Sequence, residues 1–184
     1  VAKTVLEDLL VLAAGTQMKK ETTLMGERIS DARRSLDYLI TQEIVDSDRI
    51  GVLGHSLGGG VAMWVGALDE RARAVSTAGF LTTTEQMRNH LCPCTLFDGM
   101  KEWIEFSDAY ALVAPRPLQC QVGEKENPVD GFPVEPALHA WSELIQTYRD
   151  LGDENSAELV IHEGGHEVDT SAAIDFFDRK LSGH

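Results

Sequence analysis

The sequence predicts an α/β fold in which a parallel sheet is flanked by helices. Short apolar runs typical of buried strands alternate along the chain with longer segments of helical periodicity. A strand, a helix and a second strand in that order form a crossover unit, which places neighbouring strands parallel. The 184 residues suit one domain with a hydrophobic core.

Two helices are expected before the first strand. Residues 4–14 are apolar and compatible with a helix that ends at Gly15. Residues 26–45 show a clearer amphipathic pattern, with charged side chains opposite an apolar face. That face holds Ile29, Ala32, Leu36, Leu39 and Ile40. Little in residues 1–49 is typical of a strand.

Four strands are expected in the rest of the chain. They are Ile50–Leu53, Ala72–Ala78, Leu118–Val122 and Glu158–His162. Helices are expected over residues 61–68, 134–150 and 172–181. Residues 81–117 are mixed in character, with one short helix around Trp103, Ile104 and Phe106. Four strands separated by helices are the basis for the predicted parallel sheet.

The most informative motif is Gly54-His55-Ser56-Leu57-Gly58, which follows the first strand and precedes an apolar helix. The pattern G-x-S-x-G is typical of a nucleophile elbow, a tight strand-to-helix turn with a strained serine. Its glycines are required because neighbouring backbone passes too close for a Cβ atom. We therefore interpret Ser56 as a candidate nucleophile at the positive end of a helix.

A serine hydroxyl needs a base to accept its proton, and the base needs a third group to orient it. His166 is the best candidate base, because Gly164 and Gly165 place it in a loop just beyond the last strand. His162 is the alternative, although it lies within that strand. His55, next to the serine, is expected to point elsewhere.

The orienting acid is expected in the loop after strand 118–122, which contains Glu124, Glu126 and Asp130. Serine, acid and histidine would then follow one another in an order that is known for catalytic triads. Glu126 is favoured by its spacing from Gly123. Asp130 remains the alternative.

The elbow and three further motifs together resemble the α/β-hydrolase superfamily, and more narrowly its acetyl xylan esterase-like and dienelactone hydrolase-like proteins. The further motifs are His90-Leu91-Cys92-Pro93-Cys94, Ala114-Pro115-Arg116-Pro117-Leu118 and Glu163-Gly164-Gly165-His166-Glu167. The resemblance covers residue 25 to the end of the chain. It implies an α/β-hydrolase fold, with Ser56 as nucleophile and His166 as base. Family members usually have aspartate where this chain has Glu126, so Asp130 remains the alternative for the acid.

A second departure from the superfamily concerns the oxyanion hole. The backbone N–H of Leu57 supplies one expected donor, whereas a loop among the earlier strands normally supplies the other. Those strands are not predicted in residues 1–49. We therefore expect the chain to be the C-terminal portion of a longer protein; pairing with a partner and weak catalysis are the alternatives.

The predicted activity is that of a serine carboxylesterase acting on small acyl esters, with acetyl groups on carbohydrate as one substrate. A peptidase or an acyltransferase on the same scaffold is the alternative, as is an inactive fragment or binding module. Phe80, Trp103 and Phe106 are candidates for an acyl pocket, although each is also typical of core packing.

Composition limits the partners. The formal net charge of −14 argues against binding to nucleic acid or to anionic membranes. The sequence shows no membrane-spanning run or signal peptide, so we expect a soluble protein, with the cytoplasm favoured. No cofactor or metal is expected, because His90, Cys92 and Cys94 lack a fourth zinc ligand and Cys120 fits a small core residue. An exposed sheet edge would allow self-association.

Overall fold

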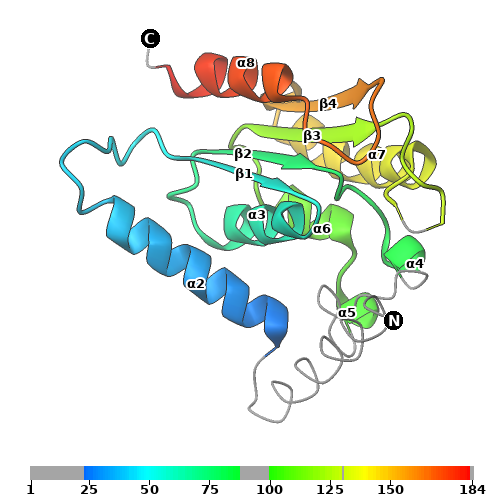
Figure 1. Ribbon diagram of the computed structural model, residues 1–184, viewed down its shortest axis with the longest axis horizontal. Coiled ribbons are helices and arrows are strands. Elements are labelled where there is room, and N and C mark those ends of the chain that lie inside the picture. The colour runs from blue at the N-terminus through cyan, green and yellow to red at the C-terminus, as the bar shows by residue number, and fades with distance from the viewer. Residues whose placement is uncertain (1–22, 88–99, 130, 183–184) are drawn as a thin grey trace, which may run out of the picture.

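The computed structural model describes residues 23–87, 100–129 and 131–182. Within them, four parallel strands form one sheet in the order β1-β2-β3-β4 (Figure 1). The strands are Gly51–His55, Ala74–Ala78, Leu118–Gly123 and Ala157–His162. The predicted parallel α/β fold is therefore confirmed, with each strand close to its predicted position. The helix predicted over residues 4–14 lies outside the described residues.

The two central strands are more deeply buried than the two outer ones. Every residue of β2 and β3 is buried, whereas most residues of β1 and β4 are only partly so. In a parallel sheet, a strand with neighbours on both sides and helices on both faces is closed to water. In the described part of the chain, β1 pairs only with β2, and it is a partly open edge.

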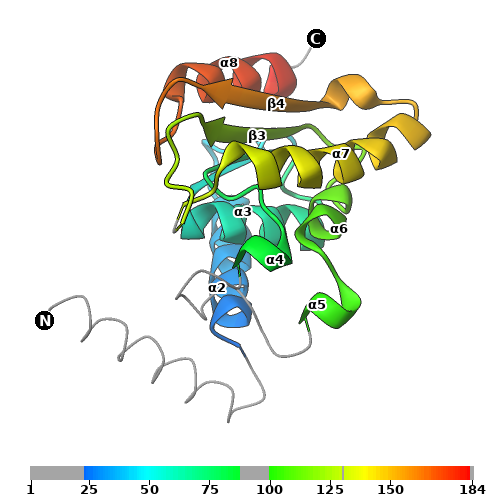
Figure 2. The ribbon, with the colours of Figure 1, turned by 90° about the vertical axis from the view of Figure 1, so that its right-hand side faces the viewer.

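Helices cover the two faces of the sheet unequally (Figure 2). The described helices are α2 (Leu24–Leu39), α3 (Leu57–Leu68), α4 (Thr84–Met87), α5 (Met100–Trp103), α6 (Phe106–Ala111), α7 (Val134–Asp150) and α8 (Thr170–Leu181). Helices α3, α6 and α7 lie on one face, and α8 lies on the other. Helix α2 packs against α3. No helix among the described residues is long and apolar enough to cross a membrane.

Helix α3 begins at Leu57, four residues before the predicted start, and α4 was not predicted. Two other predicted helices differ in their end or their number. The helix expected over residues 26–45 ends at Leu39, because the Thr41 hydroxyl and the Gln42 amide donate to the Tyr38 carbonyl and compete with helix continuation. The single helix expected around Trp103 and Phe106 is instead two helices, α5 and α6.

A capping interaction explains the second difference. Glu105 is the N-cap of α6, and its side chain accepts a hydrogen bond from the Phe106 N–H. The Asp108 carboxylate in turn accepts from the Glu105 N–H, which completes a capping box. The new helix therefore begins at Phe106, which places that side chain in the core.

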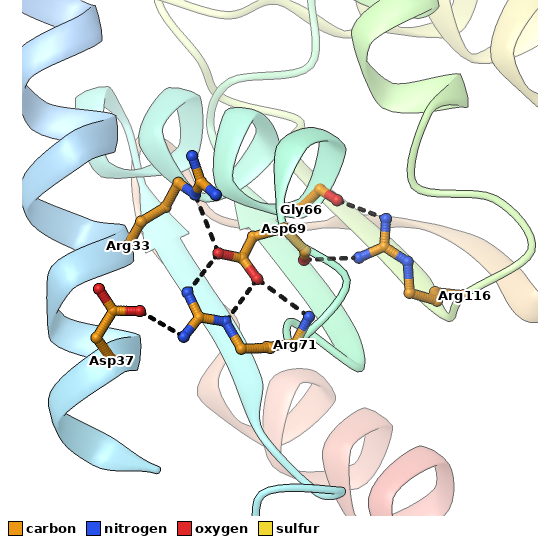
Figure 3. Close-up of polar contacts among 6 residues, drawn as sticks. All are labelled: Arg33, Asp37, Gly66, Asp69, Arg71 and Arg116. Atoms are coloured by element: carbon orange, nitrogen blue, oxygen red, sulfur yellow. Dashed lines mark hydrogen bonds and ion pairs between the residues drawn. The ribbon is translucent and has the colours of Figure 1, made fainter. Parts of the chain in front are cut away.

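A buried carboxylate joins α2 to the end of α3. Asp69 follows α3 and accepts hydrogen bonds from the side chains of Arg33 on α2 and Arg71 (Figure 3). Arg71 also donates to Asp37 of α2 at 2.6 Å. Two arginines thus neutralise one buried acid and tie two helices together.

Arg116 makes a second anchor at the same end of α3. Its guanidinium donates to the backbone carbonyls of Gly66, Asp69 and Ala72 at 2.6, 3.1 and 2.9 Å (Figure 3 shows the first two). These carbonyls lie at the end of a helix and beyond it, where intrahelical donors are lacking. The Pro-Arg-Pro motif therefore has a structural role here, in fixing the start of β3 against the end of α3.

Candidate active site

Ser56 occupies a sharp turn between β1 and α3, as the elbow motif predicts. Its backbone angles are φ 56° and ψ −123°, and among the described residues it is the only non-glycine residue with positive φ. This conformation is strained for an L-amino acid. A Cβ atom at Gly54 would overlap the Gly58 carbonyl, so the motif's first glycine is required by the close approach of the backbone.

Backbone hydrogen bonds connect the elbow to the neighbouring strands. The Ser56 N–H donates to the Ala78 carbonyl at 2.8 Å, and the Gly79 N–H donates to the Gln121 carbonyl at 3.0 Å. Since β1, β2 and β3 are parallel, their carboxyl ends meet at one edge of the sheet. The serine therefore lies at the edge where the loops after β3 and β4 also emerge.

Glu126 and His166 are brought together from the loops after β3 and β4. The Glu126 Oε1 atom lies 2.8 Å from His166 Nδ1, and the Glu126 side chain is only 1% exposed. The other carboxylate oxygen of Glu126 accepts from the Phe132 N–H at 3.3 Å. Because Glu126 holds Nδ1, the Nε2 atom is the nitrogen available to a serine hydroxyl. Asp130, the alternative acid, lies outside the described residues.

Two neighbours define the space that the His166 ring occupies. The Phe132 ring stacks on it nearly in parallel, with 5.6 Å between centroids. At Gly79, where φ is +60°, a Cβ atom would lie 2.9 Å from the ring atoms Cε1 and Nδ1 of His166. Gly79 thus leaves space for the histidine, a role that no local sequence pattern indicated.

His55 contacts His166, so the expectation that it points elsewhere is wrong. The two ring centroids are 4.5 Å apart. Burial, and then the charge of His166, lower the pKa of His55, against smaller opposing effects of Glu126 and the His166 backbone. Within the described residues, the buried Nε2 atom of His55 has no hydrogen-bond partner. Because β1 leads directly into the elbow, its last side chain lies beside the candidate base.

Ser56 and His166 are thereby brought to the same corner of the sheet. Ser56 follows His55 in the chain, and its N–H donates to the carbonyl of Ala78, the residue before Gly79. Both His55 and Gly79 contact His166. In the part of the chain that the structure describes, no hydrogen bond joins the Ser56 hydroxyl to His166. Such contacts are often long in the absence of substrate.

The remaining predicted site residues have varied surroundings. Leu57 is the first residue of α3, so its N–H has no acceptor within the helix and stays a predicted oxyanion donor. His162, the alternative base, accepts from the Gly164 N–H through Nδ1 at 3.2 Å. The contact with the buried acid is made by His166, not by His162.

The three aromatic candidates for an acyl pocket do not lie together. Phe80 and Phe106 belong to the hydrophobic core, where their rings meet edge to face at 5.5 Å. Trp103 is 86% exposed. A pocket role for the three residues stays a prediction.

The cysteines fall into two groups. His90, Cys92 and Cys94 lie outside the described residues. Cys120 is buried in β3, and burial raises the pKa of its thiol to about 12, so it fits the small core residue that was predicted. Among the described residues, no group of three metal-ligating side chains gathers.

A serine elbow after one strand, followed in chain order by an acid and a histidine at the same sheet edge, is typical of the α/β-hydrolase superfamily. Solved structures that are 20% identical or less share this fold. The chain belongs to the prolyl oligopeptidase family (Peptidase_S9), whose model matches residues 19–114, more than half of the chain and including Ser56.

Similar proteins share this fold and are longer. A Bacillus subtilis (strain 168) protein named "Putative hydrolase YtaP" is 27% identical over 168 residues, which cover 83% of this chain and 54% of that protein. A carbohydrate esterase family 15 glucuronoyl esterase from Caldicellulosiruptor kristjansonii has a TM-score of 0.71 at 20% identity, covering 85% of this chain and 50% of that one. A Bacteroides fragilis NCTC 9343 protein described as "a putative acetyl xylan esterase" has a TM-score of 0.65 at 18% identity, covering 83% and 39%. The chain thus spans between 39% and 54% of the length of these relatives.

Proposed function

We propose that the chain carries the catalytic centre of a serine hydrolase that cleaves small acyl esters. The observation that supports this most directly is the Glu126–His166 pair at the sheet edge where the strained Ser56 elbow lies. A buried carboxylate fixes the tautomer of the imidazole and stabilises the imidazolium that forms when the serine is deprotonated.

The proposed reaction has two halves. The Ser56 oxygen attacks the ester carbonyl while His166 Nε2 takes the hydroxyl proton, and the Leu57 N–H donates to the oxyanion. The tetrahedral intermediate then expels the alcohol, which receives that proton from His166. In the second half, His166 takes a proton from water, and the hydroxide attacks the acyl-serine. The Ser56 oxygen then leaves, receives that proton from His166, and the carboxylic acid is released.

The nucleophile is tested by Ser56→Ala with a chromogenic acetyl ester and a fluorophosphonate probe. We expect hydrolysis to fall at least about a thousandfold and labelling to be lost, because no other group replaces the nucleophile. Ser142→Ala is the matched control, since Ser142 lies on α7 and its hydroxyl donates only to the His139 carbonyl. Unchanged turnover in Ser56→Ala would exclude Ser56 as the nucleophile.

We further propose that a second oxyanion donor comes from outside the described residues. The observations behind this are the edge position of β1 and the length of the relatives, of which the chain spans about half. A segment of a longer polypeptide, or a second copy of the chain, would then pair with β1. One missing donor lowers the rate about a hundredfold to a thousandfold. Prompt labelling of Ser56 with slow turnover, restored in the longer polypeptide, is the expected pattern.

The acyl group and the leaving group are a finer proposal. Acetyl esters of carbohydrate are favoured by the motif resemblance and by structural neighbours that are named as carbohydrate-active esterases. A peptidase is the second candidate, favoured by the prolyl oligopeptidase family model that matches residues 19–114. Parallel assays with acetylated xylan and with a peptide nitroanilide separate the two, and added alcohols reveal acyl transfer.

A further inference from the structure

The central strand β3 carries two buried glutamines on the face that α8 covers. Gln119 and Gln121 are both 0% exposed, and they alternate with the apolar side chains of Leu118, Cys120 and Val122 on the opposite face. A buried amide costs free energy unless its donors and acceptors are bonded. The hydrogen-bond partners of these two side chains therefore show which segments this face of the sheet fixes in place.

The Gln121 amide binds both backbone groups of Asp169. Its Oε1 atom accepts from the Asp169 N–H at 2.9 Å, and its Nε2 atom donates to the Asp169 carbonyl at 3.2 Å. The second Nε2 hydrogen is donated to Gln119 Oε1 at 2.8 Å. Gln121 therefore holds the backbone of Asp169 at two points.

Asp169 ends the loop that carries His166. The loop leaves β4 at His162, and α8 begins at Thr170. Asp169 is the N-cap of α8, and its own side chain accepts from the Ala172 N–H at 3.0 Å. The residue that Gln121 holds is thus the last fixed point of the loop, three positions after His166.

The other end of the loop is fixed by the backbone that continues β3. The Glu124 N–H donates to the His162 carbonyl at 2.8 Å, and the Lys125 N–H donates to the Gly164 carbonyl at 2.9 Å. The next residue is Glu126, whose carboxylate forms the hydrogen bond with His166 Nδ1. Both ends of the histidine loop are therefore attached to β3 and its extension, which also carry the acid.

Gln119 holds Gln121 in its rotamer. Its Oε1 atom accepts from the Ser76 hydroxyl as well as from Gln121, both at 2.8 Å. Its Nε2 atom donates to Glu158 and to the Ala172 carbonyl at 2.8 and 3.1 Å. Every amide hydrogen of the two glutamines is used, so neither side chain can rotate without loss of hydrogen bonds.

We propose that Gln121 is a positioning residue for His166, which acts by fixing the backbone of Asp169 and so the distance between His166 and Ser56. The inference rests on the proposed function of His166 as a general base. A displacement of about 1 Å in a catalytic group can lower a rate about a hundredfold, so a two-point anchor at the end of a short loop has kinetic consequences.

The test is Gln121→Met, which has similar length and no hydrogen-bonding groups. We expect kcat for the acetyl ester to fall at least about tenfold, with KM changed less than about twofold, because the base is displaced while the substrate site is intact. Asp169→Ala is the matched control: it removes the N-cap side chain but retains the backbone groups that Gln121 holds. Ser76→Ala removes another bond of the same network. We expect both controls to lower stability and to leave kcat within about twofold.

A second readout does not depend on turnover. The imidazole Nδ1 proton of His166, bonded to Glu126, is followed by NMR in wild type and variants. We expect this resonance to be lost or broadened in Gln121→Met and retained in both controls. If wild type shows no turnover but the resonance behaves in this way, the proposed function fails and the positioning role stands.

Several outcomes would overturn the proposal. One is a fall in kcat for Gln121→Met that is fully explained by the fraction of the variant that is unfolded, while the His166 resonance stays as in wild type. Gln121→Asn, which retains a polar amide on a side chain one methylene shorter, repeats the test if the methionine variant does not fold. Failure of both variants to fold would assign Gln121 to the stability of the fold instead.

Discussion

Two buried carboxylates, Asp69 and Glu126, lie at opposite ends of the parallel strands and are neutralised in different ways. Asp69 follows α3 and binds two arginines, with a side chain that is 5% exposed. Hydrogen bonds from Arg71, reinforced by Arg33, hold the pKa of Asp69 well below its ordinary value. Glu126, 1% exposed, faces His166 and one backbone N–H instead.

The difference separates a structural acid from one that can take part in catalysis. Arginine is permanently charged, so the charge of Asp69 is balanced in every state of the protein. Histidine gains its positive charge only when it accepts a proton. In the proposed reaction, Glu126 would gain its strongest interaction when His166 deprotonates the nucleophile, as is expected of a triad acid.

The largest expected effect follows from removing the charge of Glu126. Glu126→Gln retains the size of the side chain but cannot fix the required tautomer of His166, so we expect kcat/KM to fall about a thousandfold to ten-thousandfold. Stability, measured by urea unfolding, is expected to change far less than activity. Glu124→Gln, an exposed change in the same loop, is the control. Retained activity in Glu126→Gln, with loss in Asp130→Asn, would move the acid role to Asp130.

The opposite pattern is expected at Asp69. Asp69→Asn leaves two arginines facing an amide, and we expect the free energy of unfolding to fall by about 2–3 kcal/mol, because hydrogen bonds to a buried charge are lost. We expect kcat to stay within about twofold, since Asp69 lies at the far end of the strands. Asp31→Asn, on the exposed face of α2, controls for loss of a surface charge. A large fall in kcat in folded Asp69→Asn would remove the distinction between the two acids.

The sequence predicted the fold more fully than the site. Buried strands and the elbow motif are local patterns, and parallel connection then places Ser56 and the loops after β3 and β4 at one edge. The choice between Glu126 and Asp130 was left open, because carboxylates in an acidic loop look alike until the chain encloses one of them. Glu126 contacts His166 and the Phe132 N–H, whereas Asp130 lies outside the described residues, so the choice of acid stays a prediction.

Other features required long-range contacts that no local pattern contains. The close approach of Gly79 to His166 depends on β2 lying next to β3. The alternation of Gln119 and Gln121 within an apolar strand was a visible signal of a polar face, but its partner, the start of α8, lies about fifty residues away in the chain. The early end of α2 was missed because side chains of Thr41 and Gln42 compete for the Tyr38 carbonyl.

The smallest expected effect is a pH dependence of stability. It sharpens the comparison because His55, near Glu126, and Asp69, at the other end of the strands, affect stability in different pH ranges. The pKa of His55 is lowered from its ordinary 6.5, chiefly by burial, with His166 and Glu126 as the charged groups that face it. The unfolded chain therefore binds a proton more readily than the folded one, and stability is lost as pH falls below about 6.5. The lowered pKa of Asp69 acts in the same direction only below its ordinary 3.8.

Urea unfolding of wild type and His55→Phe at pH 7, 6 and 5 checks this dependence. Phenylalanine retains a ring beside His166 but cannot be protonated, so the variant is expected to lose less stability between pH 7 and pH 5 than wild type. Asp69→Asn, measured in parallel, is expected to keep the wild-type slope in this range, because Asp69 stays ionised throughout it. If His55→Phe kept the full slope, the dependence would belong to other histidines. A flatter slope would show that folding lowers the pKa of His55 in solution.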